Sequence, residues 1–203
     1  MNTTATTNVT PLAENIGLLY DGWNFLRGAD TVLGFGDNID NHVLHLGRIS
    51  DQITSKRNRP SRISRITVVI GLHHPQHNPR ARAITEQYIR YWQRDSRITA
   101  IGMENSIHGP EKGVDMELGM QLLEMSGDRS LDAVVLCSAD RDMQPAIDRA
   151  VRMRGAHIEL ARWQGQRGGP QVTLPSGKKG WCHWLEPEQF YRCATPRNHQ
   201  LAA

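Results

Sequence analysis

Residues 134–143 read VVLCSADRDM, an apolar run that ends directly in a loop carrying two aspartates. The apolar part has the length of a buried strand, and the spacing of apolar residues from Met143 to Val151 predicts an amphipathic helix behind it. A strand, a loop and a helix in this order are the repeating unit of α/β folds. Functional groups in such folds gather beyond the carboxyl ends of the strands, so we expect chemistry in this acidic loop.

The rest of the chain repeats this alternation of short apolar segments with helix-like stretches. Strands are expected at 16–20, 66–71, 98–103, 133–137 and 157–160, and helices at 39–53, 81–92, 114–125 and 143–151. The alternation predicts an α/β fold, doubly wound around a mainly parallel sheet with helices on both faces. With the strands numbered along the chain, we expect the common order 3-2-1-4-5, in which strands one and four are neighbours.

The length of 203 residues fits a single domain with a few additions. Beyond residue 162 the alternation weakens into a stretch rich in Gly, Gln and basic residues, after which a strand at 181–184 and a short helix at 186–192 are expected. The predicted organisation is a disordered lead at 1–13, a single domain at 14–194 with 162–194 as its C-terminal extension, and a flexible tail at 195–203.

The composition argues against a membrane protein, because no apolar run approaches the ~20 residues needed to cross a bilayer. The first residues lack the pattern of a signal peptide, so a cytoplasmic location is expected. Cys137, Cys182 and Cys193 are too few for a disulfide framework, in agreement with a reducing compartment. The last two, with His183 and His199, leave a zinc site as an alternative, although their spacing matches no familiar zinc motif. The net charge of +3 favours polyanionic partners without establishing one.

Acidic residues follow the two strands that the expected order makes neighbours. Asp21 comes directly after the first strand, with Asn24 in the following turn, and Asp140 and Asp142 come after the fourth. Asp115 opens the helix that leads into the fourth strand. Carboxylates crowded at one edge repel one another unless a cation or protons neutralise them. Oxygen ligands of this kind suit Mg²⁺ or Mn²⁺, which can help to activate water for attack on a phosphodiester.

Each of these acids also has a purely structural interpretation. Asp140 and Asp142 precede a helix, where Asp is a common N-cap or first-turn residue, and Asp115 has the same relation to its own helix. Asp21 can form an Asx turn. Capping explains each position singly, but it does not predict that one topology brings all of them to one edge of the sheet.

Three segments, in this order along the chain, resemble the motifs of the NYN domains of the PIN-like nuclease superfamily. Residues 18–24, LLYDGWN, look like the first-strand D-x-x-N motif, and residues 111–115, EKGVD, are close to the K-G-V-D motif. The segment 134–143 is similar to the S-x-D-x-D-F strand end, with Met143 where the family often has Phe. The resemblance extends from residue 16 to about residue 162, and the combination of the three motifs is specific.

The resemblance implies a PIN-like fold and a metal-dependent nuclease, most simply an endoribonuclease whose usual substrate is RNA, single-stranded or structured. The implied metal ligands, for Mg²⁺ or Mn²⁺, are Asp21, Asp115, Asp140 and Asp142. These four and Asn24 form the expected catalytic set, and the expected substrate-binding residues are Lys112, Ser138 and Asn24. The segments 28–65 and 163–203 carry no family motif, so the choice of substrate stays open, as does pairing with a second copy of the chain or with a regulatory protein.

Two functions of other classes are alternatives. A PIN-like fold can hold RNA or a protein partner without cutting it, but here none of the matched acidic positions is substituted. A phosphatase with an aspartyl nucleophile commonly needs a second Asp two residues after the first, whereas Asp21 is followed by Gly22 and Trp23.

Basic residues gather in two stretches that could contact a nucleic acid. The first stretch, which precedes the second strand, consists of Lys56, Arg57, Arg59, Arg62 and Arg65. We favour a solubilising loop here, because this connection lies away from the acidic edge. The second stretch, 162–181, mixes basic residues with tryptophans, as sites for single-stranded nucleic acid do, although core packing explains the tryptophans equally well. Three candidate proton donors follow the second strand: His73, His74 and His77.

Overall fold

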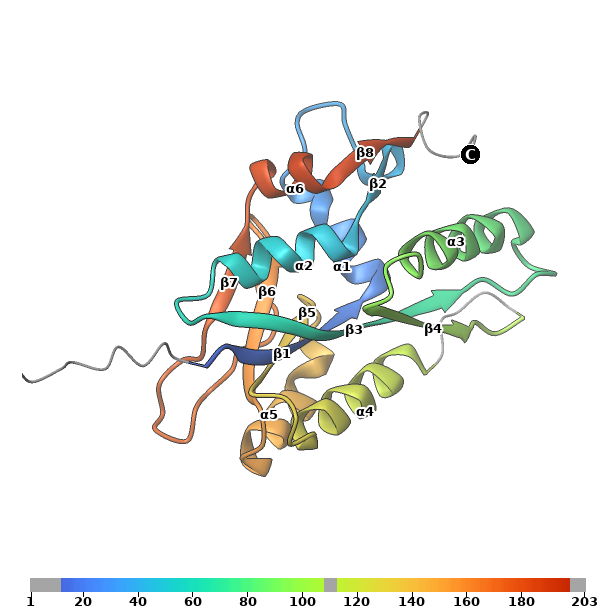
Figure 1. Cartoon of the computed structure of the whole chain (residues 1–203). Coiled ribbons are helices and arrows are strands. Elements are labelled where there is room, and N and C mark those ends of the chain that lie inside the picture. Colours follow the sequence, from blue (N-terminus) through green and yellow to red (C-terminus); the bar gives the residue numbers. More distant parts are fainter. Residues whose placement is uncertain (1–11, 108–112, 198–203) are drawn as a thin grey trace, which may run out of the picture.

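The computed structural model of the chain describes residues 12–107 and 113–197 (Figure 1). Lys112, most of the expected disordered lead and the end of the expected tail lie outside the described residues. His199 of the alternative zinc site lies outside them as well.

Six parallel strands form the central sheet, in the order β4-β3-β1-β5-β6-β7. The strands are β1 (Glu14–Asp21), β3 (Ser61–Leu72), β4 (Ile98–Glu104), β5 (Ala133–Cys137), β6 (His157–Trp163) and β7 (Cys182–Leu185). The five strands expected from the sequence have the predicted order, so the α/β fold with a doubly wound parallel sheet is confirmed. The extension adds β7 at the edge next to β6.

Helices cover both faces of the sheet (Figure 1). One face carries α1 (Gly22–Gly28), α2 (Leu46–Ser55), α3 (Pro79–Trp92) and α6 (Pro187–Cys193). The other face carries α4 (Val114–Gly127) and α5 (Gln144–Met153). Alternating residues of the central strands supply both cores: Leu18 and Tyr20 of β1 belong to the first, and Leu19 belongs to the second. Short 3-10 turns complete the chain at η1 (Ala29–Thr31), η2 (Ile39–Asn41) and η3 (Arg141–Met143).

The single helix expected at 39–53 is wrong in its first part. The structure has η2, then the strand β2 (His42–Leu44), and α2 begins only at Leu46. β2 pairs antiparallel with β8 (Ala194–Pro196), which lies within the last part of the chain. The partner is about 150 residues away in sequence, so the local spacing of apolar residues could not reveal it. The turn expected after the first strand is also more regular than predicted, because it forms α1.

Candidate active site

The carboxyl ends of β1 and β5 bring the first two acidic segments together. Tyr20 of β1 is in register with Cys137 of β5, so the residues that follow, Asp21 and Ser138, leave the sheet side by side. The Ser138 hydroxyl donates a hydrogen bond to Asp21 Oδ2 at 2.9 Å, and both residues are buried. Residues separated by more than a hundred positions in sequence therefore meet at one point.

Gly22 allows the chain to turn from β1 into α1 immediately after Asp21. A Cβ atom at this position would lie 2.7 Å from Ile70 Cβ and 2.9 Å from the carbonyl oxygen of Val69, both on the neighbouring strand β3. Only glycine fits this close approach without displacing β3. The approach holds Asp21 at the edge of the sheet and places Asn24 within the first turn of the helix.

Asn24 and Asp140 organise the loop that follows β5. The Asn24 side-chain oxygen accepts a hydrogen bond from the Ala139 backbone N–H at 2.9 Å, which ties this loop to α1. The Asp140 N–H donates to Ser138 Oγ at 3.0 Å. The Asp140 side chain in turn accepts from the Asp142 N–H at 2.9 Å and caps η3, so its structural interpretation holds, while its negative charge still acts on its neighbours.

Asp115 reaches the same edge from the first turn of α4. It follows Gly113, which takes a left-handed conformation with φ of 78° just before the helix begins. Burial raises the pKa of Asp115, and the negative charges of Asp140 and Asp142 raise it further. The carboxylates of two separate segments therefore interact electrostatically, and Asp142 takes part although it is exposed.

Asp21 is the most enclosed of these acids, with 6% of its surface exposed. Burial raises the pKa of Asp21 to about 7, and the negative charges of Asp140 and Asp115 add to this, whereas the hydrogen bond from Ser138 opposes it. A buried carboxylate beside two others is a costly arrangement for a fold. Such clusters are typical of sites that bind a cation or perform chemistry.

A family model described as the NYN domain matches residues 15–167, a segment that begins in β1 and includes all the acids described above. The chain belongs to the NYN domain family. NYN domains are a PIN-like nuclease family, so a nucleic-acid substrate is implied. The family resemblance carried by the three motifs is thereby confirmed. The residues from 168 onward lie outside the match, although β7 and α6 complete the sheet and one of its cores.

The fold of this NYN domain is also similar to a solved structure of a protein of unknown function from Vibrio parahaemolyticus. The two share 12% sequence identity with a TM-score of 0.57, over 88% of this chain and 96% of that one. At this identity the likeness concerns the fold alone. No curated protein is detectably similar in sequence. Across the described residues, no helix combines the length and the apolar character needed to span a bilayer.

The acid cluster of the NYN domain, defined as Asp21, Asp115, Asp140 and Asp142, fits a hard divalent cation by its chemistry. Its donors are carboxylate oxygens, and their mutual repulsion is the cost that a cation would remove. Within the described residues, no three His, Cys, Asp or Glu side chains already stand close enough to enclose a metal ion. Mg²⁺ is usually held by one or two carboxylates and keeps several waters, so a complete protein cage is not required for it.

The expected substrate-binding residues have different positions. Ser138 is 1% exposed, and its hydroxyl contacts Asp21 and the Asp140 backbone N–H, so it orients residues of the acid cluster from a buried position. Asn24 is partly buried and contacts the loop after β5. Lys112 lies outside the described residues, directly before Gly113.

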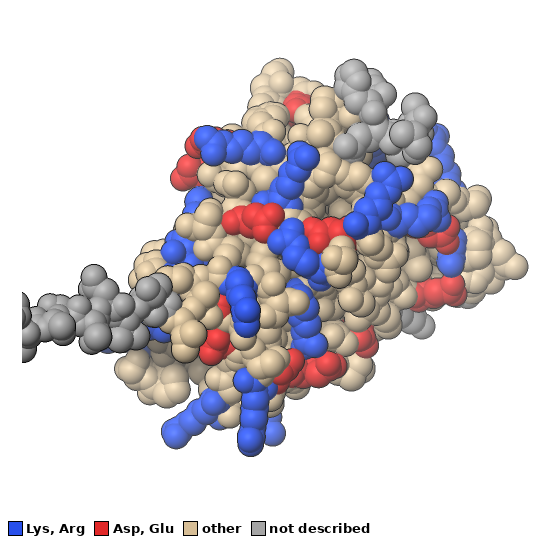
Figure 2. Space-filling view, viewed as in Figure 1, with Lys and Arg blue, Asp and Glu red and all other residues tan. Residues whose placement is uncertain are grey.

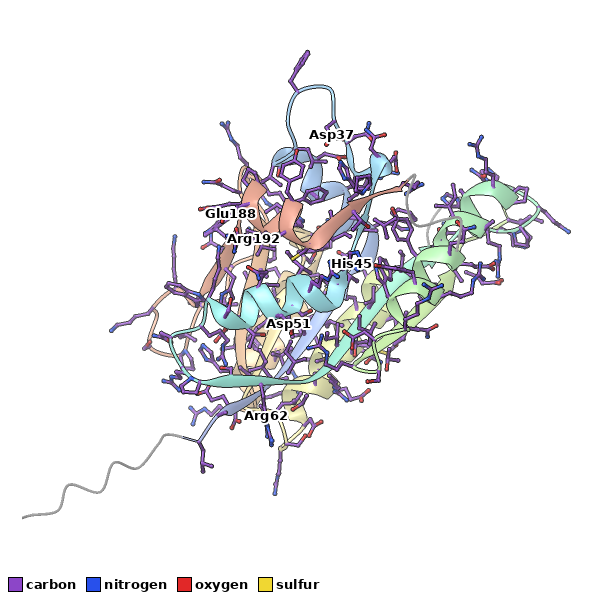
Figure 3. The ribbon with its side chains drawn as sticks, turned by 45° about the horizontal axis from the view of Figure 1, so that its top comes forward. Asp37, His45, Asp51, Arg62, Glu188 and Arg192 are labelled. Atoms are coloured by element: carbon purple, nitrogen blue, oxygen red, sulfur yellow. The ribbon has the colours of Figure 1, made fainter. Side chains whose placement is uncertain are left out.

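The basic stretch before β3 lies at the amino end of the sheet, away from the acid cluster. Arg57 is bonded to Glu159 and Glu14 at 2.8 and 2.9 Å, and Arg59 to Glu14 at 2.7 Å. The Lys56 ammonium donates to the Trp184 carbonyl at 2.8 Å. These contacts stabilise the domain, which agrees with the structural interpretation of the stretch. Arg62 lies at the start of β3 (Figure 3). On the side of the molecule that carries α2 and α6, acidic side chains are interspersed with basic ones (Figure 2).

The tryptophans of the extension differ in their burial. Trp163 is fully buried and its indole N–H donates to the Phe25 carbonyl at 2.8 Å, so it belongs to the core. Trp181 is 61% exposed. His183 is bonded to Glu159 at 2.7 Å, and no zinc-like group forms among the described Cys and His residues.

The sequence did not single out a pocket at the same edge of the sheet, lined by Trp23, Arg80 and Asn105 among others. The position of Trp23 between Asp21 and Asn24 of the first motif is the signal that could have drawn attention to it.

Proposed function

We propose that the chain is a divalent-metal-dependent ribonuclease that cuts internal phosphodiester bonds of RNA. One observation carries the proposal: acids from β1, from the loop after β5 and from the start of α4 interact at a single edge of the sheet. Capping accounts for Asp140. Asp21 is the N-cap residue of α1, and the Asn24 backbone N–H lowers its pKa, but burial beside Asp140 and Asp115 raises the pKa by more. A bound cation would account for the buried charge of Asp21, which capping of the helix alone does not.

In this proposal Asp21, Asp115 and Asp140 hold Mg²⁺ or Mn²⁺, and Asp142 completes the set from its exposed position. A bound divalent cation supplies positive charge that stabilises the charge on an attacked phosphodiester and favours ionisation of water. The residues themselves supply orientation. Ser138 fixes the Asp21 carboxylate by its hydrogen bond, and the bond between Asn24 and Ala139 keeps the β1 and β5 loops at a constant separation.

Lys112 and Asn24 are proposed to contact the substrate. Lys112 directly precedes the glycine at the start of α4, three positions before Asp115. An ammonium group at that point would neutralise a phosphate next to the one attacked. RNA is proposed as substrate because it is the usual substrate class of the domains that the motifs resemble.

The test compares end-labelled single-stranded RNA with DNA of the same sequence, in Mg²⁺, in Mn²⁺ and in EDTA. Two variants remove a single carboxylate from the acid cluster, Asp115→Asn and Asp140→Asn. A third, Asp51→Asn, removes an exposed carboxylate on α2 (Figure 3) that is paired with Arg97, and serves as the matched control. We expect internal cuts in RNA that require the metal, with a loss of about a hundredfold or more in the two cluster variants and none in the control.

Each of the other results has a definite meaning. Wild-type protein that binds RNA but cuts it in no metal would reject the nuclease and favour the binding module. Cutting of DNA alone would retain the nuclease and change its substrate. Equal activity in wild type and both cluster variants would show that the acid cluster is not the catalytic site.

A further inference from the structure

A second site lies along the carboxyl edge of the sheet. It is a pocket of about 650 Å³, and we name it the Trp23 pocket. Its main lining residues come from α1, from the loops after β3 and β4, from α3 and from the residue after β8; they are Trp23, His73, Arg80, Tyr88, Asn105 and Arg197. Trp23 is two residues from Asp21 and its indole N–H donates to the Gly71 carbonyl of β3 at 3.0 Å. The pocket and the acid cluster therefore lie at the same edge of the sheet, on the two sides of the junction of β1 with α1.

The charge of the Trp23 pocket is the opposite of that of the acid cluster. Three arginines line it, Arg27, Arg80 and Arg197, against a single carboxylate, Asp40. Asp40 is paired with Arg27 at 3.0 Å. Arg80 is exposed at the start of α3 and makes no ion pair among the described residues. Two positive charges are left to act on whatever enters the pocket, so an anionic ligand is favoured.

The walls of the pocket also hold polar atoms that lack a partner. Six buried side-chain polar atoms in the described part of the chain make no hydrogen bond, and three of them belong to this pocket: Asn105 Oδ1, His73 Nδ1 and Arg197 Nε. Asn105 is 8% exposed, and its side-chain oxygen has lost contact with water without gaining a hydrogen bond in compensation. A ligand with hydrogen-bond donors and acceptors of its own would satisfy these groups.

Aromatic rings form the remaining surface. The rings of Trp23 and Tyr88 meet edge to face at 6.4 Å between centroids. Each carries an arginine guanidinium over its face, Arg27 over Trp23 at 5.6 Å and Arg197 over Tyr88 at 5.4 Å. Aromatic and guanidinium planes are the surfaces on which unpaired nucleobases stack.

We propose that the Trp23 pocket binds one unpaired nucleotide of a single-stranded nucleic acid, next to the phosphodiester presented to the acid cluster. The base stacks on the Trp23 and Arg27 planes, the Asn105 amide contacts its edge, and Arg80 contacts the adjoining phosphate. This inference rests on the proposed nuclease function. It explains why arginines gather beside a cluster of carboxylates, because a polyanion needs attraction to reach a site that would otherwise repel it.

The test uses the full chain and its variant Arg80→Gln. The matched control is Arg90→Gln, which removes an arginine of the same helix whose side chain is 65% exposed and lies outside the pocket. Binding of short fluorescein-labelled single-stranded RNA and DNA is measured by anisotropy in EDTA at several salt concentrations. We expect Arg80→Gln to weaken binding about fivefold and to lower the slope of log K against log salt by about 0.7, while Arg90→Gln leaves both unchanged.

Two further measurements separate this inference from the nuclease proposal. RNA carrying 5-bromouridine should cross-link to the peptide that contains Trp23. Hydrolysis of bis(p-nitrophenyl) phosphate, which has no flanking nucleotide, reports on the acid cluster without the pocket and should be unchanged in the control Arg90→Gln. If the wild type binds RNA but cuts nothing, and only Arg80→Gln loses this binding, the nuclease is rejected and the pocket is kept. A wild type that cuts RNA while both arginine variants bind it equally, with cross-links elsewhere, would reject the pocket and keep the nuclease.

Discussion

Some side chains of the proposed site lower the stability of the fold, and Asp21 is the clearest case. Its carboxylate is enclosed by β1, β5 and α1 beside two other acids, and Ser138 is the hydroxyl that donates to it. A buried charge of this kind lowers the stability of a protein when no cation compensates for it.

Asp21→Asn is therefore expected to make the metal-free protein more stable. An amide keeps the oxygen that accepts from Ser138 and removes the repelling charge, so the free energy of unfolding in EDTA at pH 8 should rise by about 1–3 kcal/mol. Urea titrations with and without Mn²⁺ measure it. Added Mn²⁺ should stabilise the wild type but not the variant, because only the wild type binds the ion tightly. A variant that is less stable than the wild type in EDTA would contradict this account.

At the scale of elements, the junction of β1 with α1 sets the geometry of both proposed sites. The short connection places Asp21 on one side of Gly22 and Trp23 on the other, and it depends on the contact of Gly22 with Ile70 and Val69. Local sequence shows the turn residues but not this contact, since β3 begins some forty residues later.

Gly22→Ala should destabilise the protein by about 1–3 kcal/mol, because the added methyl group overpacks against β3. The control is Gly34→Ala, where an added Cβ would meet nothing closer than the Tyr191 hydroxyl at 3.9 Å. Thermal unfolding followed by circular dichroism compares the two. Equal melting temperatures for both variants would mean that α1 can shift without cost, and that the junction is not the constraint described here.

Elements also show what the sequence could and could not predict. Five strands and their order were predictable because each strand is a compact apolar run, and the acids at their ends followed from the order. β2 was not predictable, since the strand it pairs with in the described part of the chain is the distant β8. The Trp23 pocket was missed for a related reason: its walls come from six separate segments, and none of them carries a distinctive local pattern.

At the scale of the whole molecule, the two ends of the sheet are chemically distinct. The carboxyl end holds the acid cluster and the Trp23 pocket. The amino end is closed by a buried network in which Glu159 of β6 contacts Arg57 and His183, while Arg57 also contacts Glu14 of β1. The network joins β1, β6 and β7 through the loop before β3, so it stabilises the domain as a unit.

The network should make stability depend on pH in the acid range. Burial raises the pKa of Glu159, but hydrogen bonds from His183 and Arg57 outweigh it and leave the pKa at about 2, below the ordinary 4.5. An acid whose folded-state pKa is depressed stabilises the fold above pH 4.5, and this contribution is lost as the pH falls towards 2. Glu159→Gln should thus be less stable than the wild type by about 1–3 kcal/mol at pH 7.

Urea unfolding at pH 7, 5 and 3 tests the sign of this effect. The gap between wild type and Glu159→Gln should narrow as the pH falls below 4.5, because the Glu159 carboxylate of the unfolded chain then binds a proton that the folded state does not bind until about pH 2. The exposed pair of Glu188 and Arg192 on α6 (Figure 3) provides the control, since Glu188→Gln should change stability little at any of these pH values. A gap that stays constant or widens towards low pH would rule out the network as its source.

The position of β1 in the middle of the sheet has a consequence for synthesis of the chain. β1 is synthesised before both of its neighbours in the sheet, β3 and β5, which begin at residues 61 and 133. Until β5 has emerged, Asp21 has neither Ser138 nor Asp140 beside it. The acid cluster therefore assembles only after β5 and the loop that follows it have been synthesised.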